Sequence, residues 1–476
     1  MLFNSGDFFF FFIAVYLLYV VLPHRSQNRL LLAASYFFYG YWDWRFLGLI
    51  LISTIVDYSA GIAIHSAKTT QNNLVAKRWL IFSIVVNLGI LGFFKYFNFF
   101  IESLISFTEL FGWELSFTTL KIILPVGISF YTFQTMGYSI DVYRGVSKPT
   151  KHFFDFALFV SFFPQLMAGP IERFKRLFPQ INNPRIITYD YLTKGGWLLL
   201  WGVFKKVFIA DNLAPYTFWS VTSLSSPVTS DIYLGMIAFS IQFYCDFSGY
   251  SDMARGLAYL LGFKLSLNFN LPFFATNPSI FWQKWHITLG YWLRDYCYGP
   301  ISKSLKSKHN KKIALIITFI LAGLWHGADW RFIVWGIIWS IVLFLHVLSI
   351  PLIGKIKRKN NVIEFLTGFF GFIYTYHFWV FVGVLFVMED LHDTYNAFYL
   401  LFTNWGYSEN TIKDMVTVLY FSWPLIFVQL LQLIYQDLDI IRKWPIIFKF
   451  SFYLILLFLL ATNGAQGGSE FIYFQF

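Results

Sequence analysis

The stretch FFFFFIAVYLLYVVL, residues 8–22, holds fifteen apolar or aromatic residues and no charge. Crossing the hydrocarbon core of a bilayer takes about 20 apolar residues as a helix, and comparable runs recur along the whole chain. No basic segment precedes this stretch and no small-residue cleavage site follows it. It is therefore expected to be a first membrane span rather than a cleaved signal. The recurrence of such runs predicts a polytopic integral membrane protein.

The composition excludes a water-soluble protein. Of the 476 residues, 57% are hydrophobic and 13% are charged, which is about half the roughly 25% charged share of soluble domains. A net charge of +11 invites a nucleic-acid interpretation. The basic residues, however, lie in short loops beside apolar runs, which is the pattern that orients a membrane protein. With only Cys245 and Cys297, neither a disulfide framework nor a thiolate metal site is predicted.

The charge of the loops predicts the orientation, because Lys and Arg are retained on the cytoplasmic side of a membrane. The basic loops lie at 25–29, 68–78, 144–151, 173–185, 303–312, 355–359 and 442–449. The loops between them are acidic or neutral and contain Glu102, Glu109 and Glu114, then the polar run 216–231, then Glu389, Asp390 and Asp393. The expected spans are 8–22, 30–44, 46–64, 79–98, 121–140, 195–215, 232–250, 313–327, 331–350, 362–387, 415–436 and 447–461. This even number places both termini outside the cytoplasm.

Two stretches do not fit as simple spans. Residues 153–168 are apolar, yet basic loops flank them on both sides, so a re-entrant or interfacial segment is expected there. Residues 252–302 mix Trp, Arg, Asp and His with apolar residues. A helix with that many polar groups must face protein or water rather than lipid. We expect one membrane domain over residues 1–462, followed by a flexible extracytoplasmic tail, 463–476.

A histidine stands in the motif LWHGADW, residues 324–330. His326 lies 14 residues beyond Lys312 of the basic loop, which is roughly 21 Å into a hydrocarbon core about 30 Å thick. Ionisable residues at such depth are costly and are candidates for function. The turn after His326 is expected to lie in the outer half of the membrane, beside a cavity open to the outside. The alternative is a packed core histidine that is hydrogen-bonded to a neighbouring helix.

A second histidine stands in SIFWQKWHITLGYWLRDYCYGP, residues 279–300. On helical spacing Trp282, Trp285 and His286 share one face, and the loop assignment places this stretch toward the cytoplasm. The alternative is an amphipathic interfacial helix whose Trp and Arg residues anchor it at the lipid headgroups.

The paired Lys205 and Lys206 lie in the middle of an expected span. They could extend toward the interface or offer positive charge to a phosphate-bearing ligand. His346 and His377 lie in apolar runs without polar neighbours and are read as structural. No Gly-rich phosphate loop, nucleophile elbow or zinc-binding helix motif occurs. Single histidines separated by a span do not predict a metal site.

Several motifs together resemble the membrane-bound O-acyltransferase family, in particular its bacterial alginate, peptidoglycan and teichoic-acid branch. They are MLFNS (1–5), PVGISFYTFQ (125–134), FFPQLMAGPIER (162–173), GVFKKVFIADN (202–212), YCDFSGYSDMARGLAYLLGFKL with NFN (244–270), FWQKWHITLGYWLRDY (281–296) and LWHGADW. The resemblance covers nearly the whole chain. It implies an all-α polytopic fold of about 11–13 transmembrane helices, arranged in a ring with re-entrant helices around a thinned core.

The resemblance also implies roles for individual residues. The histidine of the LWHG motif is the expected catalytic residue, here His326, and the histidine of the W-H-I-[ST]-L motif is the second functional one, here His286. A base such as imidazole is needed to deprotonate an acceptor hydroxyl, and an oxyanion must be stabilised. The residues expected to line the substrate site are Lys205, Lys206, Trp282, Trp285, Trp325 and Asp246.

The chain ends in FIYFQF, residues 471–476, after the polar run NGAQGGSE. An apolar tail outside the membrane is unfavourable unless it inserts somewhere, and this ending resembles the C-terminal motif of the same branch, in which a tyrosine is proposed to carry the acyl group. The hypothesis is that Tyr473 reaches back into the cavity, is deprotonated by His326 and becomes acetylated. The alternative is a tail that only packs against the helices.

Three functions are therefore considered. The first is acetyl transfer from cytoplasmic acetyl-CoA, with no tightly bound cofactor. The acetyl group would cross the inner membrane to an extracytoplasmic polysaccharide or peptidoglycan through a periplasmic SGNH-type O-acetyltransferase partner. The second is D-alanyl transfer to teichoic acid on the same scaffold. The third, of another class, is a transporter of a lipid-linked sugar, with which the mid-span lysines are also compatible.

Overall fold

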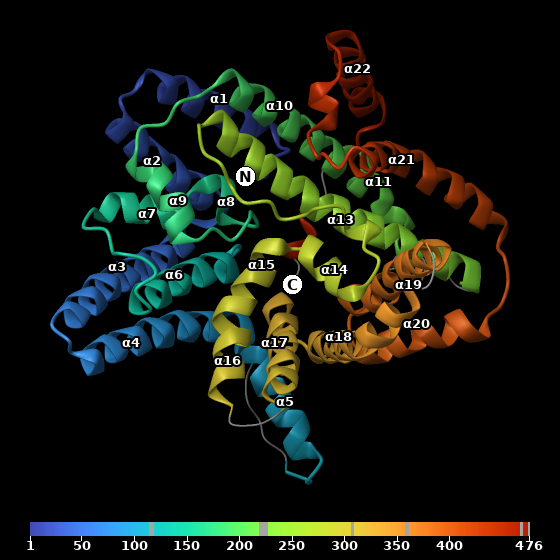
Figure 1. Cartoon of the computed structure of the whole chain (residues 1–476), viewed down its shortest axis with the longest axis horizontal. Coiled ribbons are helices and arrows are strands. Elements are labelled where there is room, and N and C mark those ends of the chain that lie inside the picture. Colours follow the sequence, from blue (N-terminus) through green and yellow to red (C-terminus); the bar gives the residue numbers. More distant parts are fainter. Residues whose placement is uncertain (114–118, 219–226, 306–308, 358–360, 467–469, 475–476) are drawn as a thin grey trace. The chain divides into compact units, whose positions relative to one another are not determined.

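The structure of the chain, a computed structural model, describes residues 1–113, 119–218, 227–305, 309–357, 361–466 and 470–474 (Figure 1). Glu114, parts of the expected loops at 216–231, 303–312 and 355–359, and part of the 463–470 run lie outside these residues. The described residues form helices and loops without a strand. They form two compact units: residues 1–196 with 254–266, and residues 197–253 with 267–476.

Each of the twelve expected spans is helical over all or most of its length. The longer helices of the first unit are α1 (Gly6–Val21), α2 (His24–Asp43), α3 (Leu47–Thr69), α4 (Asn73–Leu91), α5 (Phe97–Glu109) and α6 (Ile128–Tyr143). Those of the second unit are α17 (Asn310–His326), α18 (Trp330–Lys357), α19 (Asn361–Val387), α20 (Leu391–Thr403), α21 (Glu409–Ile434) and α22 (Ile446–Asn463). The division between the units falls inside α10 (Tyr189–Val203) and α13 (Thr229–Leu260).

The helices confirm an all-α polytopic membrane protein. Within the described ranges, six helical stretches are long and apolar enough to cross a membrane: His24–Thr69, Asn73–Glu109, Trp330–Ile353, Asn361–Val387, Glu409–Ile434 and Ile446–Asn463. The shorter α1 is apolar as well. Large apolar side chains are exposed on several of these helices, among them Phe10, Val85 and Ile447. Such a surface suits lipid, which is as apolar as the side chains themselves.

Some boundaries differ from the expected ones for local reasons. The expected basic loop at 25–29 is helical. α2 begins at His24, directly after Pro23, and therefore includes these residues. The span expected at 121–140 begins as a helix only at Ile128, after Gly127 in the left-handed conformation. A Cβ atom at Gly127 would lie 2.7 Å from the carbonyl oxygen of Leu166, so both the conformation and the close approach favour glycine.

The expected re-entrant stretch at 153–168 contains two short buried helices, α7 (Phe153–Ser161) and α8 (Phe163–Leu166). Nine residues of α7 rise only about 14 Å, which is too short to cross a bilayer. This confirms that the stretch is not a simple span.

A polar cluster joins three helices of the first unit. The buried Asp57 of α3 accepts hydrogen bonds from Ser83 and Asn87 of α4 and from Ser139 of α6, at 2.5, 2.7 and 2.5 Å. A carboxylate in a low-dielectric interior needs such donors on both oxygens, and these bonds therefore fix how α3, α4 and α6 pack.

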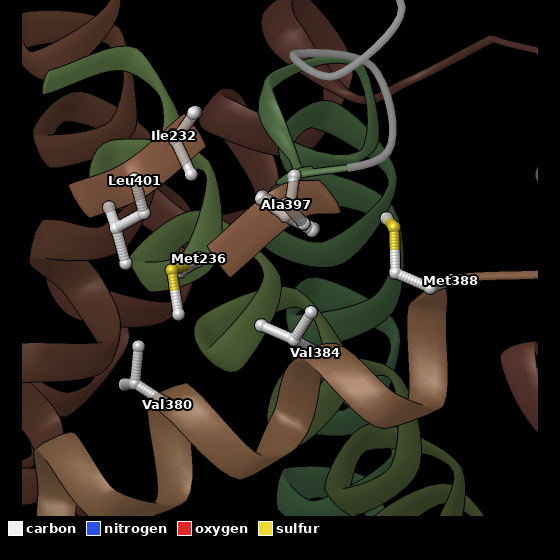
Figure 2. Packing of buried hydrophobic residues seen from close by; sticks show 8 residues of the cluster. Ile232, Met236, Val380, Val384, Met388, Ala397 and Leu401 are labelled. Atoms are coloured by element: carbon white, nitrogen blue, oxygen red, sulfur yellow. The ribbon is translucent and has the colours of Figure 1, made fainter. Parts of the chain in front are cut away.

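In the second unit a cluster of buried apolar side chains joins α13, α19 and α20 (Figure 2). Ile232 and Met236 come from α13, Val380 and Val384 from α19, and Leu401 from α20. Val380 and Val384 lie four residues apart and therefore share one face of α19. The cluster holds α19 in place, and the same helix carries an aromatic residue of the candidate active site.

Candidate active site

His326 is the last residue of α17, where the helix stops and the chain turns into α18. Gly327 follows in an extended conformation with φ −157°. Two glycines allow the close approach of α17 and α18, because a Cβ atom at Gly323 would collide with the carbonyl oxygen of Phe332 and one at Gly327 with its ring. The glycine of the LWHG motif therefore permits the packing that places His326 in the interior, where 4% of its surface is exposed.

His286 lies at a helix break and not within a continuous helix. α14 (Pro278–Lys284) ends before it, and α15 (Ile287–Leu293) begins after it. His286 itself has φ +42°, in the left-handed region, which costs a residue with a Cβ atom about 1–2 kcal/mol. The prediction that Trp282, Trp285 and His286 share one helical face is therefore wrong, because the helical spacing is interrupted at 285–286.

Asn268 holds this break in place. Its backbone carbonyl accepts a hydrogen bond from the N–H of Ile287 at 2.9 Å. Its side-chain oxygen accepts from the N–H and from the hydroxyl of Thr288, at 3.3 and 2.9 Å. These bonds satisfy donors of the first turn of α15, as a capping side chain does, and they support the strained backbone of His286.

Both histidines contact the same indole ring. The centroid of the Trp325 ring lies 5.4 Å from that of His286 and 4.9 Å from that of His326, each in an edge-to-face arrangement. His286 and His326 are 1% and 4% exposed. The structure thus brings together two histidines that lie 40 residues apart in sequence, with one aromatic ring between them.

Further aromatic rings lie against the two imidazoles. Phe247 of α13 lies 4.7 Å from His286 between ring centroids. Trp335 of α18 and Phe386 of α19 lie 5.3 and 5.1 Å from His326. An enclosure of this kind excludes water, which strengthens electrostatic interactions in the site and protects reactive intermediates from hydrolysis.

The tryptophans expected in the substrate site belong to the same aromatic region. Trp282 packs edge to face against Trp335 at 5.7 Å between ring centroids, and Trp335 in turn contacts His326. Trp285 is 1% exposed and lies 4.4 Å from Trp379 and 5.7 Å from Phe243. The ring of Trp335 thus lies between Trp282 and His326. Trp285 packs instead on Trp379 and Phe243.

Lys205 and Lys206 lie in η3, a π-helical segment, Phe204–Ala210, and both are buried. The ammonium group of Lys205 contacts Asp252 at 2.7 Å and the hydroxyl of Ser248 at 2.9 Å. That of Lys206 contacts Asp246 at 2.7 Å and Asp211 at 2.9 Å. Both ammonium groups therefore have carboxylate partners inside the protein, as buried charges require.

The C-terminal residues reach the same region. The N–H of Ile472 donates a hydrogen bond to Asp246 at 2.8 Å, and the buried ring of Phe471 packs on Phe247 and Tyr250. The backbone of Tyr473 belongs to the short helix η8, Ile472–Phe474, but its side chain lies outside the part of the chain that the structure describes.

Sequence reasoning did not single out several of these residues, and four of them illustrate why. They are Asn268, Asp252, Trp335 and Phe386. Asp252 could have been found as an acidic residue in a mostly apolar helix, whereas the others depend on which loops and helices meet. Over the described ranges, no group of three or more His, Cys, Asp and Glu side chains could hold a metal ion.

Comparisons with known proteins agree with the motifs. The sequence model of the MBOAT, membrane-bound O-acyltransferase family, matches residues 148–388, a range that includes both histidines, Trp325 and Asn268. The probable alginate O-acetylase AlgI of Azotobacter vinelandii is 41% identical over 381 residues, which cover 80% of this chain and 73% of that protein.

Two relatives with other acceptors are similar over shorter regions. The peptidoglycan O-acetyltransferase of Helicobacter pylori is 37% identical, covering 66% of this chain and 63% of its own. The teichoic acid D-alanyltransferase of Bacillus subtilis is 25% identical, covering 56% and 69%. The resemblance inferred from the motifs is confirmed, and this chain belongs to the membrane-bound O-acyltransferase family.

Proposed function

We propose that the protein is an O-acetyltransferase that takes an acetyl group from cytoplasmic acetyl-CoA for the O-acetylation of an extracytoplasmic polysaccharide or peptidoglycan. The observation that carries this proposal is the contact of His286 and His326 with the same ring of Trp325, in a water-excluding enclosure. The names of relatives at 41% and 37% identity, an alginate O-acetylase and a peptidoglycan O-acetyltransferase, support acetyl as the group that is moved.

The buried histidine at the end of α17 suits the role of a general base. His326 accepts the proton of an acceptor hydroxyl while the hydroxyl oxygen attacks the carbonyl carbon of the thioester. A carbon–oxygen bond forms, the carbon–sulfur bond breaks, and the proton passes to the departing thiolate to give free CoA. Trp282, Trp285 and Trp325 would line the path of the acyl group, and His286 would lie beside the thioester.

We further propose that Tyr473 is the first acceptor and that a periplasmic SGNH-type O-acetyltransferase completes the transfer to the glycan. Support comes from the hydrogen bond between Ile472 and Asp246, which holds the backbone next to Tyr473. Support also comes from Phe247, which contacts both Phe471 of the tail and His286. The phenol would receive the acetyl group as an ester and later yield it to a second hydroxyl.

The charge of the loops supports a proposal about the location of the protein. We propose that the protein lies in the cytoplasmic membrane with both termini outside, so that acetyl-CoA binds from the cytoplasm and the tail faces the acceptor. Residues 1–462 would act as one acyltransferase domain, since the family match at 148–388 includes residues of both compact units.

The D-alanyl alternative is less well supported, because the teichoic acid D-alanyltransferase of Bacillus subtilis is only 25% identical. A transporter of lipid-linked sugars is less well supported too, because Lys205 and Lys206 already have carboxylate partners.

Replacement of the base tests the proposal. In the producing cell, His326→Ala should abolish acetylation of the extracytoplasmic polymer while the amount of exported polymer stays unchanged. His346→Ala, which replaces a half-buried histidine in the later part of α18, is the control and should leave acetylation intact. Loss of the polymer itself in His326→Ala would indicate a transporter, and normal acetylation would contradict the proposed role of His326.

A further inference from the structure

The residues after α22 return to η3 and α13, and hydrogen bonds hold them at two places. At the first, the side-chain amide of Asn212 donates to the carbonyl of Asn463 at 2.8 Å, and the N–H of Ala465 donates to the carbonyl of Val207 at 3.2 Å. At the second, the ammonium group of Lys206 contacts the carbonyl of Glu470 at 3.5 Å.

Both places involve the π-helical segment η3. Lys206 and Val207 are consecutive residues of it, and one contacts Glu470 while the other contacts Ala465. A π-helix is rare and is found mostly at functional sites. Here it presents one side-chain donor and one backbone acceptor to the same returning segment.

The carboxylate of Asp246 contacts Lys206 through one oxygen and the tail through the other. Its Oδ1 atom contacts the ammonium group of Lys206 at 2.7 Å, and its Oδ2 atom accepts the hydrogen bond from Ile472 at 2.8 Å. Asp246 is 2% exposed. A buried carboxylate oxygen without a donor is unfavourable, so an undocked tail leaves Oδ2 without the donor that Ile472 supplies in this structure.

Apolar contacts extend the docking toward the active site. Phe471 is 2% exposed, and its ring lies 5.8 Å from Phe247 and 5.0 Å from Tyr250. Phe247 lies 4.7 Å from His286 on the other side. One aromatic ring therefore separates the tail from the imidazole of His286.

We propose that Asp246 and Lys206 form a docking site for the backbone of the C-terminal segment, with Phe471 as its apolar anchor, and that Asp246 is the positioning residue that holds the turn Ile472–Phe474 beside the active site. The groups that this buried ion pair binds are backbone groups of the same chain, the carbonyl of Glu470 and the N–H of Ile472. The docking stands without any acyl transfer, whereas its use to present Tyr473 to acetyl-CoA rests on the proposed function.

A matched pair of tail variants tests the docking without changing a residue of η3 or α13. Ile472→Pro removes the N–H that Asp246 accepts, at the first position of a short helix, where proline is well tolerated. Ile472→Ala keeps the N–H and removes only the side chain. Hydrogen–deuterium exchange of the C-terminal peptide is measured by mass spectrometry on the full-length protein in lipid nanodiscs.

The hydrogen bond to a charged acceptor sets the expected size of the effect. Exchange of the remaining tail amides should be about tenfold to a hundredfold faster in Ile472→Pro than in Ile472→Ala, and Asp246→Asn should also accelerate it. Asp252→Asn, which alters the neighbouring carboxylate bonded to Lys205, should leave tail exchange as in the unmodified protein. Equal exchange in the proline and alanine variants would overturn the docking site.

The same samples separate the docking from the relay. After incubation with acetyl-CoA, the mass of the C-terminal peptide reports an acetyl group on Tyr473. If Ile472→Pro loosens the tail while the unmodified protein never acquires the acetyl group, the docking site stands and the relay is wrong. If the acetyl group forms at the same rate in the unmodified protein and in Ile472→Pro, the relay stands and Asp246 is not its positioning residue.

Discussion

The ring of Trp325 meets the imidazole of His286 edge to face, with 5.4 Å between the two centroids and 74° between the planes. Trp325 belongs to the same motif as His326, the residue that follows it, so a contact of Trp325 also fixes the end of α17 relative to the break between α14 and α15. The two histidine motifs therefore meet through one side chain. Loss of that side chain should affect both.

Trp325→Ala is expected to lower stability by about 3–5 kcal/mol, because it leaves a cavity between the two imidazoles. Acetylation should fall to background in the same variant. Trp325→Phe keeps an aromatic ring in the same place and should retain most of the stability. Thermal unfolding in nanodiscs measures the first effect, and acetyl content of the polymer measures the second. Full activity of Trp325→Ala would contradict the idea that this ring organises the site.

On the proposed function, with acetyl-CoA as the donor, Asn268→Ala should lower the rate of acetyl transfer more than it lowers the affinity for the donor. The substitution removes the acceptor for the N–H and hydroxyl of Thr288 and releases the left-handed backbone of His286, and a misplaced catalytic group typically costs about a hundredfold in rate. Asn268→Asp keeps an acceptor oxygen and serves as the control. Steady-state kinetics separate the two parameters, and an unchanged kcat in Asn268→Ala would argue against a positioning role.

The parts of this molecule that depend on local sequence were predictable. Each expected span has a helix, because apolar runs of sufficient length determine helices in a membrane protein. The motifs predicted His326 and His286 as candidate residues, and both rings contact Trp325 in the structure. The break at His286 was not predictable from spacing, because the residue responsible is Asn268, which lies in a preceding loop. Likewise, nothing local to Lys206 indicates that Glu470 and Asp246 are its partners.

Gly323→Ala should disturb the active site although it adds only one methyl group. The added Cβ atom would collide with the carbonyl oxygen of Phe332, so α17 and α18 must move apart next to His326. Overpacking of this kind costs about 1–3 kcal/mol. Gly368→Ala is the matched control, because its Cβ atom would have open space in α19 and alanine favours a helix. A drop in melting temperature and activity is expected only for Gly323→Ala, and equal behaviour of the two variants would disprove the steric explanation.

Lys206→Met should destabilise the protein by about 3–5 kcal/mol, because it removes the ammonium group that lies 2.7 Å from Asp246 and 2.9 Å from Asp211 and leaves two buried carboxylates without it. The cost should come from the uncompensated charges and not from the lost lysine stem, whose volume methionine largely replaces. The triple variant Lys206→Met, Asp246→Asn, Asp211→Asn should therefore recover most of the lost stability. The melting temperature of each variant in the same nanodiscs measures this recovery. A triple variant less stable than Lys206→Met alone would mean that each carboxylate has a further essential partner, and that the three residues do not act as one ion-pair network.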